Sequence, residues 1–252
     1  MSVGSGAREQ RQNYAEVVAR LAAAQKTRAP GAPAYSIYVN RPLGRLLAAG
    51  AYLAGLTPNA VTAVSAAFTF AAIVLIAVVP PQPLVGAAIG LLLILGYALD
   101  SADGQVARLR GGGSAAGEWL DHVVDAAKLS SLHLAVLISW YRFLELPGEW
   151  VLLIPPGFAV VAAVLFFAMI LNDFLRADAA GGAGAPRARR AGGGIRSLLA
   201  LPTDYGVLCL AFLLFGIPAV FVPVYGILFA ATTGYALLAL PKWFREMSRI
   251  RC

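Results

Sequence analysis

The amino-acid sequence predicts an all-α integral membrane protein with six transmembrane helices preceded by an interfacial amphipathic helix. Hydrophobic residues make up 59% of the 252 residues and charged residues only 13%, which is about half the charge of a soluble domain. Six long apolar runs follow one another, and the basic residues gather between alternate runs. This composition argues against a soluble enzyme and excludes disorder for most of the chain. Two cysteines cannot build a disulfide scaffold.

The N-terminal part of the chain precedes these runs. Residues 1–40 are polar, and we expect them to form a cytosolic arm. Residues 41–56 are apolar but too short to cross a bilayer, because a spanning helix needs about 20 apolar residues. With Arg41 and Arg45 at one end, this segment is expected to lie in the membrane interface.

The apolar runs predict the transmembrane helices, and the last two allow alternatives. The fifth run is short, and Gly216-Ile217-Pro218 separates it from the sixth. A hairpin of two spans and one long kinked helix both fit; we favour the hairpin, because a single helix of that length would exceed a hydrocarbon core of about 30 Å. The expected membrane domain covers residues 41–246, a cytosolic tail covers 247–252, and the spans cover about 59–79, 84–109, 115–141, 150–175, 205–217 and 218–240.

The distribution of basic residues predicts the topology. With the N-terminus inside, only Arg142 of the lysines and arginines falls outside, and Lys128 lies within a span. The positive-inside rule therefore places both termini in the cytoplasm, and we expect the cell (plasma) membrane. The formal net charge of +7 then reflects cytoplasmic loops and anionic lipid contact, not nucleic-acid binding. Residues 178–197, rich in Gly, Ala and Arg, are expected to form a flexible cytosolic loop.

Acidic residues gather at the facing ends of the second and third spans, where a carboxylate costs about 2.5–3.5 kcal/mol on insertion scales. Asp100 and Asp103 are three residues apart, and Asp121 and Asp125 are four apart, so each pair lies on one face of a helix. The short glycine-rich link at 109–116 makes the two helices antiparallel neighbours. We therefore expect these carboxylates to face one another near the cytosolic surface.

Four converging carboxylates predict a site for divalent cations, because they cannot stay ionised together unless cations neutralise them. Oxygen ligands favour Mg²⁺, Mn²⁺ or Ca²⁺. Two ions held by shared carboxylates are a common device for phosphoryl transfer, and we expect two Mg²⁺ or Mn²⁺ ions. The purely structural alternative is ion pairing with Arg108 and Lys128, which would leave the acids under-neutralised.

The same residues resemble the signature of the CDP-alcohol phosphotransferases. The stretch DSADGQVAR from Asp100, then eight residues, then GEWLDHVVD ending at Asp125, fills all eight signature positions. The stretch PNAVT at residues 58–62 also resembles the nucleotide-side segment of that family. The resemblance covers roughly residues 35–245 and includes the six-span layout and the interfacial helix.

The resemblance implies roles for individual residues. It makes Asp100, Asp103 and Asp121 metal ligands, while Asp125 would share a metal or act as the base that deprotonates the acceptor hydroxyl. It also implies a CDP-binding site built from Asn59, Thr62, Asp103, Gly104, Ala107, Arg108 and Gly117.

Other polar residues carry weaker signals. Lys128 follows Asp125 by three residues and is expected to form a salt bridge with it; contact with the substrate is the alternative. Asp204 lies where a helix N-cap is needed. Several loop arginines mark membrane sidedness, and the alternative is that one or two bind an acceptor phosphate: Arg187, Arg189, Arg190 and Arg196.

Taken with the resemblance, these residues predict a divalent-metal-dependent transferase of phospholipid biosynthesis. We expect it to move a phosphatidyl group from CDP-diacylglycerol to the hydroxyl of a polyol or polyol phosphate, with release of CMP; a homodimer is left open. The alternative is a membrane cation transporter using the same carboxylates, but such sites usually lie near the bilayer midplane between repeated halves. The complete set of acids argues against a scaffold without chemistry.

Overall fold

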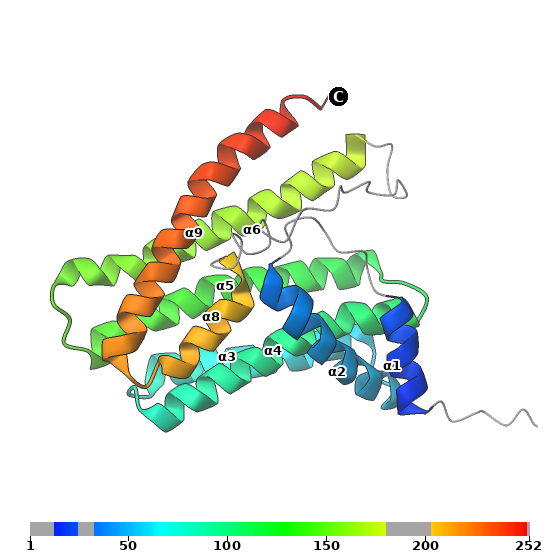
Figure 1. The fold of residues 1–252 in the computed structure, drawn as a ribbon, viewed down its shortest axis with the longest axis horizontal. Helices are drawn as coiled ribbons and strands as arrows, with labels where there is room; N and C mark the ends of the chain where they lie inside the picture. The colour runs from blue at the N-terminus through cyan, green and yellow to red at the C-terminus, as the bar shows by residue number, and fades with distance from the viewer. Residues whose placement is uncertain (1–12, 25–32, 180–202, 251–252) are drawn as a thin grey trace, which may run out of the picture.

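The computed structural model describes residues 13–24, 33–179 and 203–250, and within these ranges it contains helices and no strands (Figure 1). Among the described residues, five helical segments are long and apolar enough to cross a membrane. An all-α, multi-pass membrane architecture is therefore confirmed. The long helices are α3 (Pro58–Val78), α4 (Pro83–Leu109), α5 (Ala115–Phe143), α6 (Ile154–Ala179), which continues η2 (Glu149–Leu153), and α9 (Pro218–Met247).

The fifth apolar run forms a shorter helical segment than the others. It consists of α8 (Tyr205–Ala211) and η4 (Phe212–Leu214), and it is not among the five helices of spanning length. Pro218 lies in the first turn of α9, a position that proline favours because its missing N–H needs no partner there. Two separate helices therefore replace the single long kinked helix that the sequence also allowed.

Polar caps and glycines set the ends of the helices that carry the acidic residues. The Thr57 side chain accepts a hydrogen bond from the backbone of α3, and the Ser114 side chain does the same for α5. Between α4 and α5, Gly111 and Gly112 adopt φ angles of +94° and +131°, which glycine tolerates best. This tight link reverses the chain, while α3 packs against both α4 and α5.

The N-terminal helices pack against the outer side of α4. On the first of them, Val17 and Leu21 are buried in one apolar cluster with Val106 of α4. The Tyr14 hydroxyl donates to the carbonyl of Leu46 at 2.9 Å. Part of the expected polar arm is therefore docked on the membrane domain. The elements are α1 (Tyr14–Ala23), η1 (Ser36–Asn40) and α2 (Arg41–Leu53).

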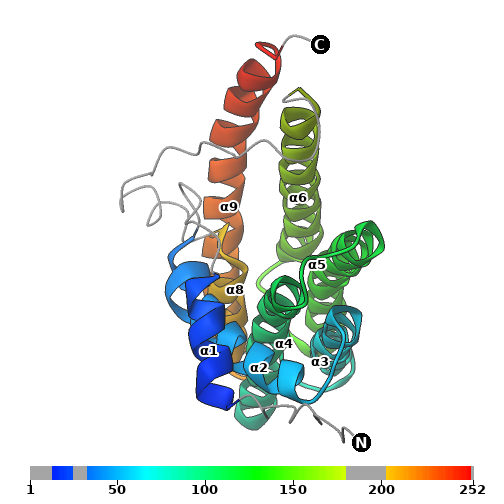
Figure 2. The ribbon, with the colours of Figure 1, turned by 90° about the vertical axis from the view of Figure 1, so that its right-hand side faces the viewer.

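Helices α6 and α9 pack against each other and extend beyond α3, α4 and α5 at their C-terminal ends (Figure 2). The last span is longer than the expected 218–240, because α9 continues through Pro241 to Met247. Arg176 near the end of α6 holds Glu246 of α9 at 2.7 Å. This ion pair ties the two extensions together.

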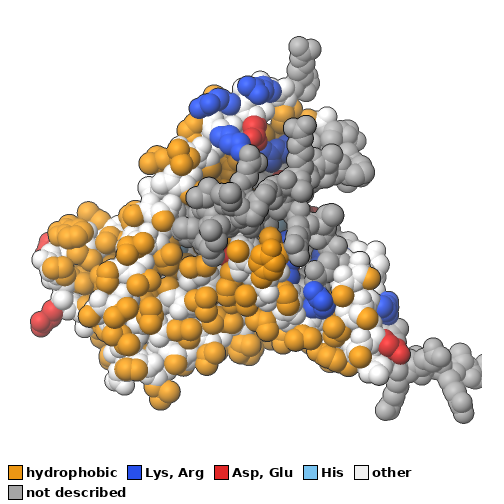
Figure 3. Space-filling model, viewed as in Figure 1, with side chains coloured by type: hydrophobic (Ala, Val, Ile, Leu, Met, Phe, Trp, Pro, Cys, Tyr) orange, Lys and Arg blue, Asp and Glu red, His pale blue; other side chains and the backbone are white. Residues whose placement is uncertain are grey.

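The surface separates apolar flanks from charged ends. Hydrophobic side chains cover the broad face of the molecule, and Lys and Arg gather toward the ends (Figure 3). Large apolar side chains such as Leu84 and Leu238 are about four-fifths exposed, which would be unfavourable in water and is expected in lipid. The core below them is aromatic: His133 stacks on Phe158 and lies 2.5 Å from the Tyr225 hydroxyl.

Candidate active site

Three aspartates converge between α4 and α5. Asp100 and Asp103 come from successive turns of α4 and Asp121 from the first turns of α5, and one carboxylate oxygen of each lies within 4.8 Å of the others. The Asp121 Oδ1 atom is buried and has no hydrogen-bond partner among the described residues. A buried, ionisable oxygen without a donor is costly. The three carboxylates therefore fit a divalent cation, for which oxygen atoms are the preferred ligands.

Helix α3 orients one of these carboxylates. The Thr62 hydroxyl lies 2.7 Å from Asp103 Oδ2 and 3.1 Å from the carbonyl oxygen of Pro58. A hydroxyl donates only one hydrogen bond, and the charged carboxylate is the stronger acceptor. The other oxygen of Asp103 accepts from the backbone N–H of Gly104. Both oxygens of Asp103 are thus held, and its side chain is nearly buried.

The fourth aspartate faces a lysine instead of the cluster. The Lys128 ammonium lies 2.7 Å from Asp100 Oδ1 and 3.2 Å from Asp125 Oδ1. It also donates to Ser65 Oγ at 3.2 Å. The expected salt bridge between Lys128 and Asp125 is confirmed, and the stronger contact with Asp100 is new. This network connects α3, α4 and α5 at the deep end of the site.

A cavity of about 810 Å³ opens beside the cluster, between the starts of α3 and α5 and the end of α4. Gly117 is one point of close packing, since a Cβ there would lie 3.1 Å from Asn59 Oδ1. Glu118 and His122 also line this cavity. The structure places the whole predicted CDP-binding set on its wall: Asn59, Thr62, Asp103, Gly104, Ala107, Arg108 and Gly117.

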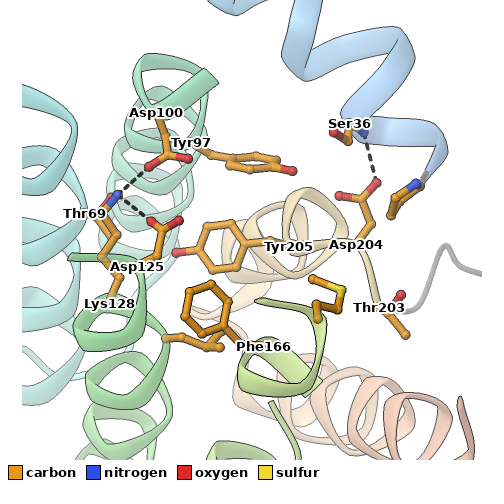
Figure 4. A pocket seen from close by; sticks show the side chains of 13 residues that line it. Ser36, Thr69, Tyr97, Asp100, Asp125, Lys128, Phe166, Thr203, Asp204 and Tyr205 are labelled. Carbon is orange, nitrogen blue, oxygen red and sulfur yellow. Dashed lines mark hydrogen bonds and ion pairs between the residues drawn. The ribbon is translucent and has the colours of Figure 1, made fainter. Parts of the chain in front are cut away.

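A second cavity of about 320 Å³ lies on the other side of the aspartates (Figure 4). It shares no lining residue with the first: Asp100 and Asp125 face it, whereas Asp103 and Asp121 face the larger cavity. In Figure 4 the Tyr205 side chain points toward Asp125 and Lys128. The four aspartates are therefore divided between two separate spaces.

The far wall of the second cavity is closed by Asp204. Its Oδ2 accepts from the backbone N–H of Ser36 at 3.0 Å, and its Oδ1 accepts from Gly206 at 3.0 Å. The predicted N-cap of α8 is thus confirmed, and the same side chain also holds η1. Burial raises the pKa of Asp204, although these backbone hydrogen bonds lower it in part.

Sequence reasoning missed several residues around the aspartates. Tyr97 precedes Asp100 by three residues, so the helical spacing that identified the acids could have identified it too. The ring of Tyr97 contacts that of Tyr205 edge-on, with centroids 5.2 Å apart. Ser65, which accepts a hydrogen bond from Lys128, has no comparable spacing signal in the sequence. Its position beside the site depends on how α3 crosses α4. The loop arginines singled out from the sequence lie outside the described residues: Arg187, Arg189, Arg190 and Arg196.

The fold and the site together define an integral membrane protein with an intramembrane carboxylate centre between two cavities. The family model for CDP-alcohol phosphatidyltransferases matches residues 55–239. The chain therefore belongs to the CDP-alcohol phosphatidyltransferase family, the enzymes of phospholipid synthesis that its signature residues resemble. Helices α1 and α2 lie outside the matched range. Among curated proteins, no sequence matches the chain.

A solved structure shares this fold. The phosphatidylinositol phosphate synthase PgsA1 of Mycobacterium tuberculosis with CDP-DAG bound is 22% identical and has a TM-score of 0.51; the match covers 82% of this chain and 94% of that one. A structure of the same synthase in complex with manganese and citrate is 20% identical with a TM-score of 0.47, and the match covers 82% of this chain and 89% of that one.

Proposed function

We propose that this membrane enzyme transfers a phosphatidyl group from CDP-diacylglycerol to the hydroxyl of a polyol or polyol phosphate and releases CMP. The observation that carries the proposal is the position of the aspartates between two cavities. Asp103 and Asp121 line the larger one, and Asp100 and Asp125 line the smaller one. Donor and acceptor can therefore reach the carboxylates from different sides. The similar mycobacterial synthase, whose structure has CDP-DAG bound, is consistent with this donor.

The larger cavity is the proposed CDP site. Gly104 and Gly117 leave room for a nucleotide to approach the backbones of α4 and α5. The Arg108 guanidinium lies on the same wall, and it can bind a phosphate oxygen pair in bidentate fashion. Asn59 adds an amide that can hydrogen-bond the base or the ribose. These groups bind and orient the donor, whose acyl chains would remain between the helices in the inner leaflet.

We propose that Asp100, Asp103 and Asp121 hold Mg²⁺ or Mn²⁺. When bound, such an ion polarises the pyrophosphate and stabilises the negative charge of the departing CMP. Thr62 keeps the Asp103 carboxylate fixed for this task. The second ion expected from the sequence would be shared by Asp100 and Asp125, which Lys128 already bridges.

Asp125 is the proposed general base. Its carboxylate lies at the edge of the smaller cavity, where Lys128 binds its Oδ1 atom. We assign to Oδ2 the removal of the proton from the acceptor hydroxyl, which makes the acceptor oxygen able to attack the phosphorus. The aromatic side chains of Tyr97 and Tyr205 form the neighbouring wall. They limit the access of water, which would otherwise compete with the acceptor as the nucleophile.

The acceptor phosphate, where there is one, needs positive charge, because a dianion beside carboxylates is unfavourable. The name of the similar mycobacterial synthase, phosphatidylinositol phosphate synthase, fits a phosphorylated polyol. Lys128 is already engaged by two carboxylates. We therefore propose that one or two loop arginines supply that charge, from the set Arg187, Arg189, Arg190 and Arg196.

The membrane topology is part of the proposal. We propose that the segment from Tyr205 to Leu214 forms the sixth crossing, with α2 in the interface. The ends of α4, α6 and α9 carry Arg108, Arg176 and Arg245, so the positive-inside rule places them, both termini and the active site in the cytoplasm. We propose the plasma membrane as the location, and a homodimer as the assembly.

Reconstituted vesicles provide the test. The purified protein is mixed with CDP-diacylglycerol, Mg²⁺ or Mn²⁺ and a panel of polyols and polyol phosphates, and release of CMP is measured. We expect CMP only when a matching acceptor and a divalent ion are both present, and Asp100→Asn or Asp121→Asn to abolish it. Metal uptake into sealed vesicles that ignores nucleotide, without CMP release, would favour the cation transporter instead.

A further inference from the structure

The hydroxyl of Tyr205 is a polar group at the smaller cavity that the proposed reaction does not yet use. It is buried and has no hydrogen-bond partner among the described residues. A buried phenol hydroxyl usually has one, because an unpaired polar group away from water costs free energy. The side chain of Tyr205 lines the smaller cavity together with Asp125 and Lys128. An occupant of this cavity can therefore supply the partner that the described residues do not.

The polar groups around this hydroxyl are engaged elsewhere. Lys128 binds Oδ1 of Asp100 and Oδ1 of Asp125, and the other oxygen of Asp125 is the proposed base. Asp204 accepts from backbone N–H groups with both of its oxygens. The buried thiol of Cys209, one turn further along α8, is only a weak acceptor. The hydrogen-bonding capacity of the phenol is therefore directed at the contents of the cavity.

The ring of Tyr205 is fixed by its neighbours. Tyr205 is the first residue of α8 and directly follows the N-cap residue Asp204. Tyr97 contacts its ring edge-on with centroids 5.2 Å apart, and Tyr97 in turn stacks on Tyr35 at 6.4 Å. In Figure 4 the hydroxyl points toward Asp125. This direction is held before any substrate binds, so little conformational freedom is lost when a ligand bonds to the hydroxyl.

The position of the hydroxyl indicates which kind of acceptor it fits. Under the proposed function, the reacting hydroxyl of the acceptor lies at Asp125. A group on the adjacent carbon of the acceptor then lies toward Tyr205, whose hydroxyl can both donate and accept a hydrogen bond. A second hydroxyl on the acceptor matches both capacities, whereas a methylene leaves Tyr205 unpaired.

We propose that Tyr205 selects the acceptor by hydrogen-bonding the hydroxyl next to the one that Asp125 deprotonates. Tyr205 contacts the substrate but not the reacting oxygen, so it determines specificity and leaves the chemical step to Asp125. The acceptor class is then a vicinal diol, and an alcohol without the second hydroxyl is used less well. This inference rests on the proposed function, because it takes the smaller cavity as the acceptor site.

Matched acceptors test this in the vesicle assay of CMP release, with the full-length protein. Each pair differs only in the hydroxyl beside the reacting one: glycerol 3-phosphate against 3-hydroxypropyl phosphate, and inositol phosphate against its analogue deoxygenated at the adjacent carbon. For the wild type we expect kcat/KM to be about 2- to 12-fold lower with the deoxygenated member, which is the net effect of one hydrogen bond. Tyr205→Phe should lose the same factor on the complete acceptor, through KM, and nothing on the deoxygenated one.

Tyr141→Phe is the matched control, because Tyr141 is 77% exposed at the opposite end of α5, and it should leave both rates unchanged. Tyr205→Phe should also bind CDP as the wild type does in calorimetry, since Tyr205 does not line the larger cavity. Thermal unfolding shows that each variant is folded.

The outcomes separate this inference from the proposed function. An equal loss by Tyr205→Phe on both members of a pair would overturn it, because Tyr205 would then act through Asp125 or through the fold. Equal use of both members by the wild type would overturn it as well. Absence of CMP release by the wild type with every acceptor would refute the proposed function itself.

Discussion

The hydrogen bond from Thr62 to Asp103 offers a precise test of how α3 prepares the site. Thr62→Val keeps the shape of the side chain but removes the donor that lies 2.7 Å from the carboxylate. A hydrogen bond to a charged group contributes about 1.5–3 kcal/mol. Loss of a group that orients a metal ligand weakens metal binding about 10- to 100-fold, or about 1.4–2.8 kcal/mol. We expect the Mn²⁺ affinity of Thr62→Val to fall by that factor.

Titration with Mn²⁺, followed by calorimetry, measures this change. Thr62→Ser keeps the hydroxyl and should bind Mn²⁺ nearly as well as the wild type. Thr69→Val is the matched control, because Thr69 is also buried on α3, two turns further along, and lines the other cavity. Unchanged affinity in Thr62→Val, or an equal loss in Thr69→Val, would refute the idea that this hydrogen bond orients a metal ligand.

Three further predictions concern other parts of the molecule. Asp125→Asn should lose turnover, measured as CMP release, and keep CDP binding in calorimetry; a matching loss of CDP affinity would contradict its assignment as the base. Gly96→Ala should destabilise the fold by about 1–3 kcal/mol, because its Cβ would lie 2.3 Å from Thr69 Oγ1. Gly50→Ala, inside α2, meets no atom within 4 Å and should raise the unfolding temperature slightly, because alanine favours a helix more than glycine does. Burial raises the pKa of Asp204 in the folded protein. This difference from the unfolded chain stabilises the fold at a pH below the ordinary carboxyl pKa of about 4, and the stabilisation is lost as the pH rises through the raised pKa. Thermal unfolding from about pH 4 to pH 7 should therefore show a smaller loss of stability in Asp204→Asn than in the wild type, and equal slopes would argue against this titration.

The sequence predicted what depends on spacing along one helix. The three-residue interval between Asp100 and Asp103 places both on one face of α4, and the link of glycines returns the chain so that Asp121 faces them. The ion pair of Lys128 with Asp125 follows from the same rule, since the two are one turn apart. These features are local along the chain, and the geometry of each helix together with the short glycine link determines them.

Features that depend on how helices cross were beyond such reasoning. The contact of Lys128 with Asp100 joins residues 28 positions apart, and that of Ser36 with Asp204 joins residues 168 apart. Neither has a periodic signal in the sequence. The docking of α1 does have one, because Val17 and Leu21 lie about one turn apart on one face of the helix. The C-terminal extension of α9 was missed because Pro241 reads as a helix end, whereas the Arg176–Glu246 pair stabilises the turns beyond it.

The separation of the two cavities has a consequence for the order of events during turnover. The two spaces share no lining residue, so under the proposed function the donor and the acceptor would occupy different places beside the aspartates. Both substrates can be present at once, and the acceptor oxygen can attack the phosphorus directly, without a phosphatidylated protein as a stable intermediate. Steady-state rates should then give intersecting rather than parallel double-reciprocal lines, and a chiral phosphorus in the donor should emerge with inverted configuration.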